Sequence, residues 1–388
     1  MIRKITNDVY FVGAIDWDRK LFDELIPLPN GTTYNSYLVK GQEKIALIDT
    51  VDPKKEEEFF NNLDKLNIGK IDYVVSNHAE QDHSGLINKV VEKYGAKVVT
   101  NEKCAEFLKT HVHVKDDDIK IIKDGEELDL GGKTLKFVFT PWAHWPETMV
   151  TYLKEDKILF SCDLFGSHFA TSDIEQNGGE KLLEMAKRYF AEIMMPFRSI
   201  IKKNIEKIEQ LDIEKIAPSH GPIYSNPSFI LNEYKKWVSD VVKNEVVVLY
   251  VSMHDSTKKM IEYLADKLMD EGLSVKLHNI VNSDIGEIAV DLVDASTVVI
   301  GTPMVLTGVH PLMAGAIYLV NALRPKTKYL ALVGSYGWGG RFIDEIKEMT
   351  KNLKAEIFEP VVVKGLISDV NYEKLDNLAK EIIKKNKD

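Results

Sequence analysis

The sequence predicts an α/β protein, α+β in part, built from two successive domains. After Asn244, apolar runs alternate strictly with helical patterns, which is typical of a doubly wound parallel sheet. Before that residue, two runs of short strands with interspersed helices suggest a four-layered αββα sandwich. A chain of 388 residues is long enough for two or three domains, each with its own core. We therefore expect domains at residues 1–243 and 244–388.

Composition narrows the class of protein. The fractions of 44 % hydrophobic and 28 % charged residues are those of an ordinary soluble globular protein. The formal net charge of -10 argues against a nucleic-acid binder and against a protein of anionic membranes. No apolar signal core follows the N-terminus, and no apolar run approaches the roughly 20 residues of a membrane helix. We expect a cytoplasmic protein.

The N-terminal region reads as short strands separated by helical patterns. The expected strands are Tyr34–Lys40, Lys44–Ile48, Tyr73–Ser76, Ala96–Thr100, Thr134–Thr140, Met149–Leu153, Lys157–Ser161 and Lys215–Pro218. The expected helices are Lys54–Leu66, Ser84–Tyr94, a longer region over Gly179–Leu211, and Pro227–Lys243.

The C-terminal region opens on Val246–Val251, a continuous apolar and β-branched run that indicates a strand buried on both faces. Further strands are expected at Ser274–Ile280, Thr297–Gly301, Lys328–Gly334 and Ile357–Val363. Helices are expected between and after them, at Lys258–Glu271, Gly286–Leu292, Leu312–Ala322, Phe342–Leu353 and Tyr372–Lys385.

Four potential metal ligands fall within six residues, at His78, Glu80, Asp82 and His83. They follow the apolar run at residues 71–75, and open α/β architectures place their chemistry at such strand ends. The pattern H-x-E-x-D-H resembles the H-x-H-x-D-H signature of the metallo-β-lactamase fold, with a glutamate replacing the second histidine. The added carboxylate makes the site harder and more anionic, which suits iron better than a histidine-only set.

Three later segments carry a metal-binding side chain directly after an expected strand, namely His144, Asp163 and His220. Taken alone, a histidine at a strand end is more often a structural residue than a ligand. The order H-x-E-x-D-H, H, D, H over four strand-to-loop exits favours a dinuclear metal site. His168, and either Tyr189 or Phe190, are candidate neighbours of that site.

These residues make the N-terminal part resemble the metallo-β-lactamase-like domain of the flavodiiron proteins (A-type flavoproteins). The stretches at residues 31–37, 142–149 and 162–166 are similar to other recurrent stretches of that family. The resemblance implies a diiron centre with His78, Glu80 and His144 on one iron, Asp82, His83 and His220 on the other, and Asp163 bridging them. A hydrolase-like site with a mixed metal pair could be complete without His78.

The two cysteines, Cys104 and Cys162, are far apart and form no CxxC pair. This excludes a disulfide scaffold, a thiolate zinc site and a cysteine-ligated iron–sulfur or rubredoxin-like centre within the sequence. Cys162 neighbours Asp163, but a buried free thiol is the favoured interpretation.

Three loops of the second domain lie where a doubly wound sheet binds its ligand. Hydroxyls and free helix N–H groups in the first loop make a phosphate cradle, and aromatic rings in the third could stack on an isoalloxazine. No G-x-G-x-x-G follows the first strand, so a mononucleotide is favoured over a dinucleotide. The domain is similar to a flavodoxin that binds FMN, although flavodoxins often carry glycine where Asp255 stands and a polar residue where Leu306 stands. The expected flavin-binding residues are Ser252, Met253, His254, Asp255, Ser256, Thr257, Pro303, Met304, Val305, Leu306, Thr307, Gly308, Ser335, Tyr336, Gly337, Trp338 and Gly339. A flavodoxin-like fold without flavin is the alternative.

The two domains together imply a flavodiiron oxidoreductase. Reduction of dioxygen to two waters takes four electrons, of which two ferrous ions supply two and reduced FMN supplies two. Reduction of two nitric oxide molecules to nitrous oxide takes two, which the irons alone provide. The leading hypothesis is an oxygen-reducing enzyme, and the alternative is a nitric oxide reductase on the same scaffold. A zinc hydrolase with a flavodoxin-like appendage and a non-catalytic carrier or gas sensor are hypotheses from other classes.

Each domain offers its site at its own loop face, so a linear chain is expected to hold the two sites far apart. The family resemblance implies a head-to-tail homodimer, alone or as a dimer of dimers, in which one subunit's flavin faces the other's irons. The electron donor is expected to be a separate partner. Reduced deazaflavin coenzyme F420, used by related enzymes of methanogens, is the leading candidate, and rubredoxin is the alternative.

Overall fold

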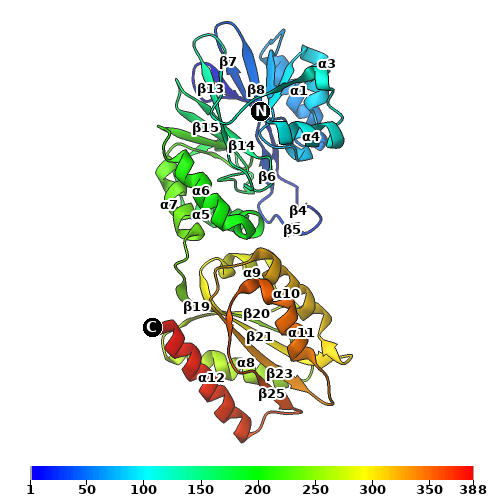
Figure 1. Cartoon of the computed structure of the whole chain (residues 1–388), viewed down its shortest axis with the longest axis vertical. Helices are drawn as coiled ribbons and strands as arrows, with labels where there is room; N and C mark the ends of the chain where they lie inside the picture. Colours follow the sequence, from blue (N-terminus) through cyan, green and yellow to red (C-terminus); the bar gives the residue numbers. More distant parts are fainter. Residues whose placement is uncertain (1, 388) are drawn as a thin grey trace. The chain divides into compact units, whose positions relative to one another are not determined.

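The computed structural model describes residues 2–387 (Figure 1). The chain divides into two compact units, residues 1–238 and 239–388. Within the described residues, no helix is both long and apolar enough to cross a membrane.

The first unit is built on two seven-stranded sheets. The first sheet has the order β1 (Arg3–Lys4), β2 (Val9–Phe11), β7 (Tyr37–Lys40), β8 (Ile45–Ile48), β9 (Tyr73–Val75), β10 (Lys97–Thr100) and β11 (Ile119–Ile121). The second has the order β12 (Glu127–Asp129), β13 (Thr134–Phe139), β14 (Met149–Leu153), β15 (Ile158–Cys162), β17 (Lys215–Pro218), β18 (Ile223–Tyr224) and β16 (Glu175–Gln176). Two small ribbons pair β3 (Ala14–Asp16) with β6 (Thr32–Tyr34), and β4 (Leu21–Phe22) with β5 (Ile26–Pro27).

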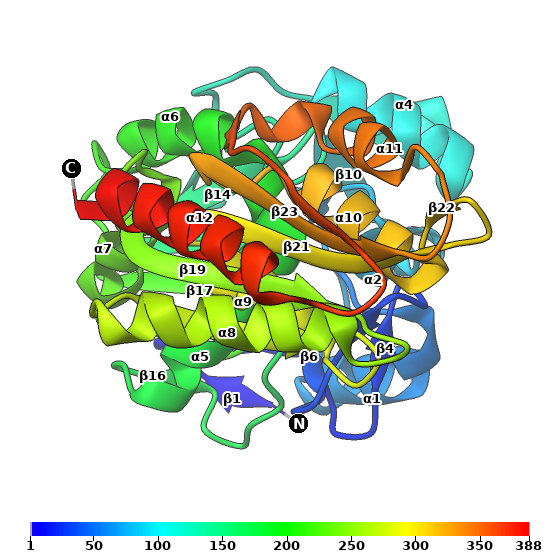
Figure 2. The same cartoon turned by 90° about the horizontal axis from the view of Figure 1, so that it is seen from below.

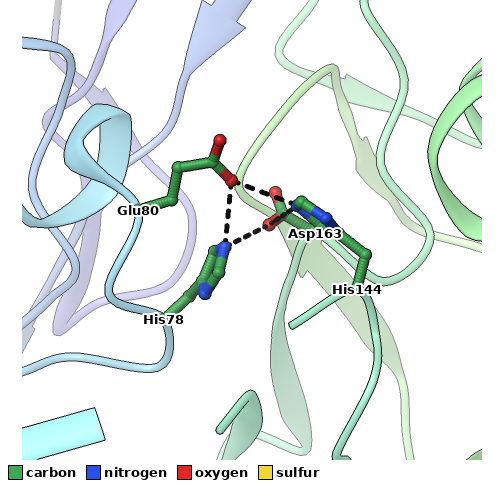
Figure 3. A group of neighbouring side chains, drawn as sticks. All are labelled: His78, Glu80, His144 and Asp163. Carbon is green, nitrogen blue, oxygen red and sulfur yellow. Dashed lines mark hydrogen bonds and ion pairs between the residues drawn. The ribbon is translucent and has the colours of Figure 1, made fainter. Parts of the chain in front are cut away.

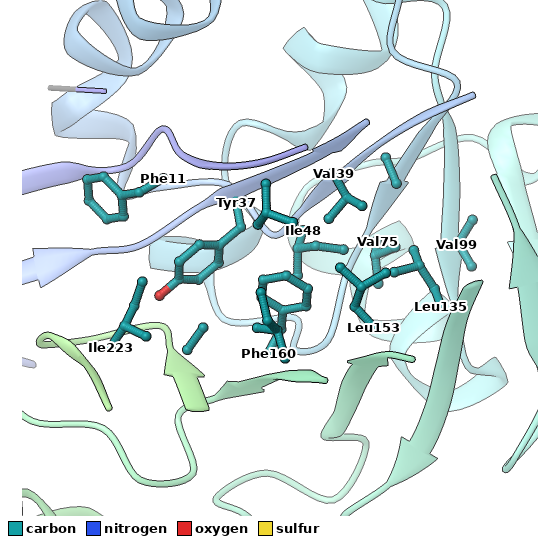
Figure 4. Close-up of a cluster of buried hydrophobic side chains, with 14 of the residues drawn as sticks. Phe11, Tyr37, Val39, Ile48, Val75, Val99, Leu135, Leu153, Phe160 and Ile223 are labelled. Atoms are coloured by element: carbon teal, nitrogen blue, oxygen red, sulfur yellow. The ribbon is translucent and has the colours of Figure 1, made fainter. Parts of the chain in front are cut away.

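The apolar core of the first unit lies between its two sheets (Figure 4). Val39, Ile48 and Val75 come from the first sheet and meet Leu135 and Phe160 of the second; all five are buried. Burial of such side chains stabilises the fold by roughly 1.5–3 kcal/mol each.

Helices complete the layers of the first unit. They are α1 (Glu56–Lys65), α2 (Gln81–Ser84), α3 (Ile87–Tyr94), α4 (Glu102–His111), α5 (Glu180–Tyr189), α6 (Arg198–Ile208) and α7 (Pro227–Val238). Apolar residues of α1, α3 and α4 pack on the outer face of the first sheet, and α5, α6 and α7 lie beside the second (Figure 1). The result is the expected αββα sandwich.

The second unit is a parallel sheet in the order β20 (Ser274–Asn279), β19 (Lys243–Tyr250), β21 (Ala295–Val305), β23 (Tyr329–Tyr336) and β24 (Glu356–Ile357). The strand β25 (Val361–Lys364) also pairs with β23, in parallel. The short strand β22 (Gly308–Val309) pairs antiparallel with β21. Its helices are α8 (Ser256–Asp270), α9 (Ile285–Leu292), α10 (Pro311–Leu323), α11 (Phe342–Met349) and α12 (Asp369–Lys387). Apolar residues of α8 and α12 cover one face, and α9 to α11 lie on the other (Figure 2). This is the doubly wound sheet that the β-α alternation predicts.

The structure corrects two expected strands. The run expected over Tyr34–Lys40 is two strands in different sheets, because the chain leaves β6 at Asn35. There the backbone N–H of Asn35 donates to the Ser219 carbonyl at 2.8 Å, and its side-chain amide donates to two further carbonyls. The run expected over Ile357–Val363 is also divided, at Pro360, which lacks the N–H that a continuous strand needs.

Some expected helices also differ. The helix expected over Pro227–Lys243 ends at Val238, and Lys243 already belongs to β19. The helix α4 was not expected from the sequence. The helical region over Gly179–Leu211 is interrupted by a π-helix at Phe190–Met194 and a 3-10 turn that contains Pro196.

Candidate metal centre and flavin site

The first ligand group comprises His78, Glu80, His144 and Asp163, whose coordinating atoms all lie within 4.8 Å of one another (Figure 3). Glu80 Oε2 lies 3.1 Å from Nε2 of His78 and 3.1 Å from Nε2 of His144. Asp163 Oδ2 lies 3.5 Å from each of the same two nitrogens. Four ligand atoms therefore converge on one point.

The second ligand group comprises Asp82, His83 and His220. Asp82 Oδ1 lies 3.3 Å from His83 Nε2, and Asp82 Oδ2 lies 3.2 Å from His220 Nε2. The other oxygen of Asp163, Oδ1, lies 3.1 Å from His83 Nε2 and 3.5 Å from His220 Nε2. Asp163 thus presents one oxygen to each group, and all seven side chains named from the sequence meet in one pocket.

Local structure brings the first four side chains into this pocket. The loop after β9 is held by Asp49, whose carboxylate accepts hydrogen bonds from the backbone and side-chain N–H groups of Asn77, each at 2.8 Å. The one-turn helix α2 begins after Glu80, so Asp82 and His83 follow on a single tight turn. Ser84 Oγ donates to the Ala79 carbonyl at 2.7 Å and closes that turn.

The histidine tautomers suit metal binding. His78 Nδ1 donates to Glu147 Oε1 at 2.7 Å, and His220 Nδ1 donates to the Thr33 carbonyl at 2.6 Å. With the proton on Nδ1, the lone pair of Nε2 is free to face the pocket. Metal-ligating histidines are oriented by hydrogen bonds of this kind.

The charges in the pocket need compensation. Burial alone lowers the pKa of His83, but the carboxylates of Asp82 and Asp163 outweigh it and raise that pKa to about 10. Burial also opposes the positive charge of His144, but the neighbouring carboxylates of Asp163 and Glu80 raise its pKa to about 9. Without a cation, protons on the imidazoles balance the carboxylates. A metal replaces those protons, because a ligating imidazole is neutral.

Buried oxygens without a hydrogen-bond partner also indicate that the pocket binds a cation. Both carboxylate oxygens of Asp82 and Oδ2 of Asp163 are buried and accept no hydrogen bond from any residue between 2 and 387. Burial of such oxygens without a partner costs free energy. Four imidazoles and three carboxylates fit two ferrous ions with a hydroxide, since three carboxylates and one hydroxide balance four positive charges.

Further groups touch the pocket. The Tyr189 hydroxyl donates to Asp163 Oδ1 at 3.0 Å, and the π-helix that follows Tyr189 marks an irregularity of the kind often found at functional sites. The His168 ring lies 4.9 Å from the ring of His220, and Thr32 Oγ1 lies 2.9 Å from His168 Nδ1. Sequence reasoning missed Glu147 and Thr32, because no local pattern marks a residue whose partner is distant in sequence.

The second unit has a pocket of about 230 Å³ at the C-terminal ends of β19, β21 and β23. Ten expected flavin-binding residues line it, namely Ser252, Met253, His254, Ser256, Thr257, Pro303, Met304, Ser335, Tyr336 and Gly337. Gly365 and Leu366 also line it, and these were not anticipated. The other expected residues lie in the same loops but outside the lining; they are Asp255, Val305, Leu306, Thr307, Gly308, Trp338 and Gly339.

The pocket fits a phosphate-bearing ligand. It lies at the N-terminus of the 15-residue helix α8, where free N–H groups and hydroxyls suit a phosphate. Thr257 Oγ1 lies 2.9 Å from Ser335 Oγ, and Ser256 Oγ donates to the Gly365 carbonyl at 2.7 Å. Asp255 has φ +62°, in the left-handed region that glycine adopts readily and aspartate tolerates. This conformation explains why an aspartate can stand where flavodoxins often carry glycine.

Comparison with known proteins identifies both units. Residues 32–221 match the family model "ODP family beta lactamase", and residues 248–377 match the Flavodoxin model. A protein of Methanocaldococcus jannaschii is 39% identical, with 92% of each chain covered. A nitric oxide reductase of Moorella thermoacetica is 35% identical, with 91% of this chain and 90% of that protein covered.

Two solved structures are similar to this chain over both units. Rubredoxin oxygen:oxidoreductase from Desulfovibrio gigas superposes with a TM-score of 0.96 at 32% identity, covering 100% of this chain and 99% of that one. The flavodiiron protein from Giardia intestinalis superposes with a TM-score of 0.93 at 29% identity, covering 100% and 97%.

Fold and site together define an oxidoreductase that joins a flavodoxin domain to a metallo-β-lactamase-like domain. The chain belongs to the flavodiiron proteins, which carry FMN and a non-haem diiron centre. The zinc-hydrolase hypothesis is therefore disfavoured.

Proposed function

We propose that this chain reduces dioxygen to water at its diiron centre, with electrons passed through FMN from reduced coenzyme F420. The observation that carries the proposal is Asp163, which turns one oxygen to each ligand group inside a buried pocket. The proposed ligands are those named from the sequence: His78, Glu80, Asp82, His83, His144, Asp163 and His220.

The iron pair, when bound, supplies the site where a diatomic gas is reduced, and FMN supplies electrons to it. The protein's own residues hold and shield that site. His78 and His220 are fixed by their Nδ1 hydrogen bonds, and Tyr189 donates to the carboxylate of Asp163. Except for Glu80 and His144, the proposed ligands are buried, which limits contact between water and the reacting gas.

The flavin is proposed to bind in the pocket at the start of α8, in a domain of residues 244–388. Reduced F420 is favoured as donor because a relative of this chain comes from a methanogen. The cytoplasm is the proposed compartment, since its reducing conditions suit two free buried cysteines.

The test uses protein loaded anaerobically with ferrous iron and FMN. Reduced F420 is expected to bleach the flavin, and oxygen is then expected to be consumed without hydrogen peroxide. The variant His144→Ala should keep flavin reduction but lose oxygen turnover by more than about 100-fold, because it removes an iron ligand. The exposed His113→Ala is the matched control. Full oxygen turnover by His144→Ala, or bound zinc with hydrolase activity, would overturn the proposal.

A second candidate is nitric oxide reduction with electrons from rubredoxin. It is favoured by the name of the relative from Moorella thermoacetica, nitric oxide reductase. Two nitric oxide molecules, two electrons and two protons give nitrous oxide and water. Turnover with nitric oxide and reduced rubredoxin that exceeds turnover with oxygen and reduced F420 would support this candidate over the first.

We also propose a head-to-tail homodimer, alone or as a dimer of dimers. Mixing two inactive variants, one that lacks the flavin and one that lacks an iron ligand, tests it.

A further inference from the structure

Glu147 is a buried acid next to the proposed metal ligands but outside the ligand set. Its side chain is fully buried, and Oε1 accepts two hydrogen bonds, from His78 Nδ1 at 2.7 Å and from the Ala79 backbone N–H at 3.1 Å. The Glu147 carbonyl also accepts from the Asn101 side chain at 2.7 Å. The carboxylate is therefore fixed in position, with its negative charge directed at the far side of the His78 ring.

The second ligand group has no equivalent of this carboxylate. His220 Nδ1 donates to the neutral Thr33 carbonyl, and His83 Nδ1 is buried without a hydrogen-bond partner anywhere in residues 2–387. The two halves of the site therefore differ in the groups that stand behind their histidines, although their direct ligands are similar.

A histidine that donates to a carboxylate is a stronger electron donor to its metal than one that donates to a carbonyl. The carboxylate charge also favours the more positive oxidation state of a nearby ion, an effect that is strong where water is excluded. Both effects stabilise the ferric state on the His78 side.

We propose that Glu147 is a positioning residue that orients His78 and makes the iron bound by His78, Glu80 and His144 the more easily oxidised of the pair. This inference rests on the proposed diiron site. The iron bound by Asp82, His83 and His220 then has the higher reduction potential and is reduced first.

A neighbouring pocket makes the role of Glu147 testable by chemical rescue. Glu147 lines a pocket of about 430 Å³ together with Glu106, Pro141 and Thr148. Because the Glu147 carboxylate lies 2.7 Å from His78 Nδ1, we expect its truncation to open space between that pocket and the His78 ring. A formate ion has the size and charge to replace the missing carboxylate.

The experiment compares Glu147→Gln and Glu147→Ala with the control Glu106→Gln. Gln keeps an oxygen that can accept from His78 but removes the charge, whereas Ala removes both. Glu106 lines the same pocket and is exposed. The readouts are iron per chain, the rate of iron loss to a chelator, and the two reduction potentials, followed by the electron paramagnetic resonance signal of the mixed-valent state.

We expect Glu147→Gln to keep two irons, to raise the lower of the two potentials and to leave the upper one unchanged, so that the gap narrows. Glu147→Ala should lose iron to the chelator about 10- to 100-fold faster, and formate should slow that loss. The control should match the wild type in every readout.

Two results would overturn the inference while leaving the proposed function intact. One is that Glu147→Gln changes neither of the two potentials, and the other is that it shifts both potentials by the same amount. A wild-type protein that binds no iron would instead contradict the proposed function itself, so the two failures are distinguishable.

Discussion

Asp163 owes its position to an irregularity at the end of β15. The register between β15 and β17 shifts between Phe160 and Cys162, and Cys162 adopts φ +52°. Such bulges re-aim the next side chain. Asp163 consequently leaves the strand direction and reaches both ligand groups, a position that no other carboxylate of the site shares.

Replacement of Asp163 should therefore affect both metals at once. We expect Asp163→Asn to bind both irons more than about 100-fold more weakly, beyond the usual effect of residues that only support a ligand. Iron per chain, measured after dialysis, checks this, and Asp173→Asn serves as an exposed control. A variant that keeps one iron at wild-type affinity would contradict the bridging role.

The two cysteines are expected to be chemically inert in the folded protein. Burial raises the pKa of Cys104 to about 12 and that of Cys162 well above its ordinary value. Below its pKa a thiol stays protonated, and the thiolate is the reactive form. A thiol reagent at pH 8 should label neither residue until denaturant is added. Rapid labelling of the native protein would show that one of them is accessible.

Site residues that directly follow a strand could be predicted from the sequence. Site residues whose partner lies far away in the sequence could not. His144 and His220 could be named because each stands at a strand exit. Glu147 could not, because its partner His78 is 69 positions away in the sequence. Its contact with the site exists only once the two sheets have packed together.

Among the strands, the wrong predictions lie where side chains or a proline interrupt an apolar run. The break at Asn35 depends on carbonyls near residue 220, so local propensity could not reveal it. The alternation of β and α elements after Asn244 was readable because the central strands β19, β21 and β23 are largely buried and carry continuous apolar runs. The order of strands and helices in the second unit was therefore predictable, although the division of β24 from β25 and the hairpin of β21 and β22 were not.

The hairpin of β21 and β22 offers a test at the same scale. A Cβ on Gly340 would lie 2.2 Å from Met304 Sδ and 2.8 Å from the Thr307 carbonyl, so the hairpin must move if Gly340 is replaced. Met304 lines the flavin pocket. We expect Gly340→Ala to weaken FMN binding by about tenfold, which corresponds to about 1.4 kcal/mol.

Gly315→Ala is the matched control for that variant. Nothing lies within 4 Å of a Cβ at Gly315, which is inside helix α10. It should leave FMN affinity unchanged and stabilise the protein by up to about 1 kcal/mol, because alanine favours the helix. Flavin fluorescence titration and thermal unfolding measure the two effects. Equal FMN affinity in the Gly340→Ala and Gly315→Ala variants would contradict the prediction that the position of the hairpin affects FMN binding.

The proposed dimer predicts complementation between inactive subunits. Thr257→Phe fills the flavin pocket and His144→Ala lacks an iron ligand, so each variant alone should be inactive. In a mixed head-to-tail dimer, the flavin of the His144→Ala subunit faces the irons of the Thr257→Phe subunit. Random mixing makes half of the dimers mixed with one working pair each, so about a quarter of wild-type turnover is expected.

Turnover of the mixed sample is compared with each variant alone after subunit exchange. A mixture as inactive as its components, despite exchange confirmed by mass, would mean that electrons pass within one chain.

The proposed ligands come from both sheets of the first unit. Four follow β9 of the first sheet, and the other three follow β13, β15 and β17 of the second. An ion that binds only the folded state adds its binding free energy to that state. We therefore expect newly made chains without iron to unfold more readily and to be degraded sooner by proteases, so that the cellular lifetime of this enzyme depends on its iron supply.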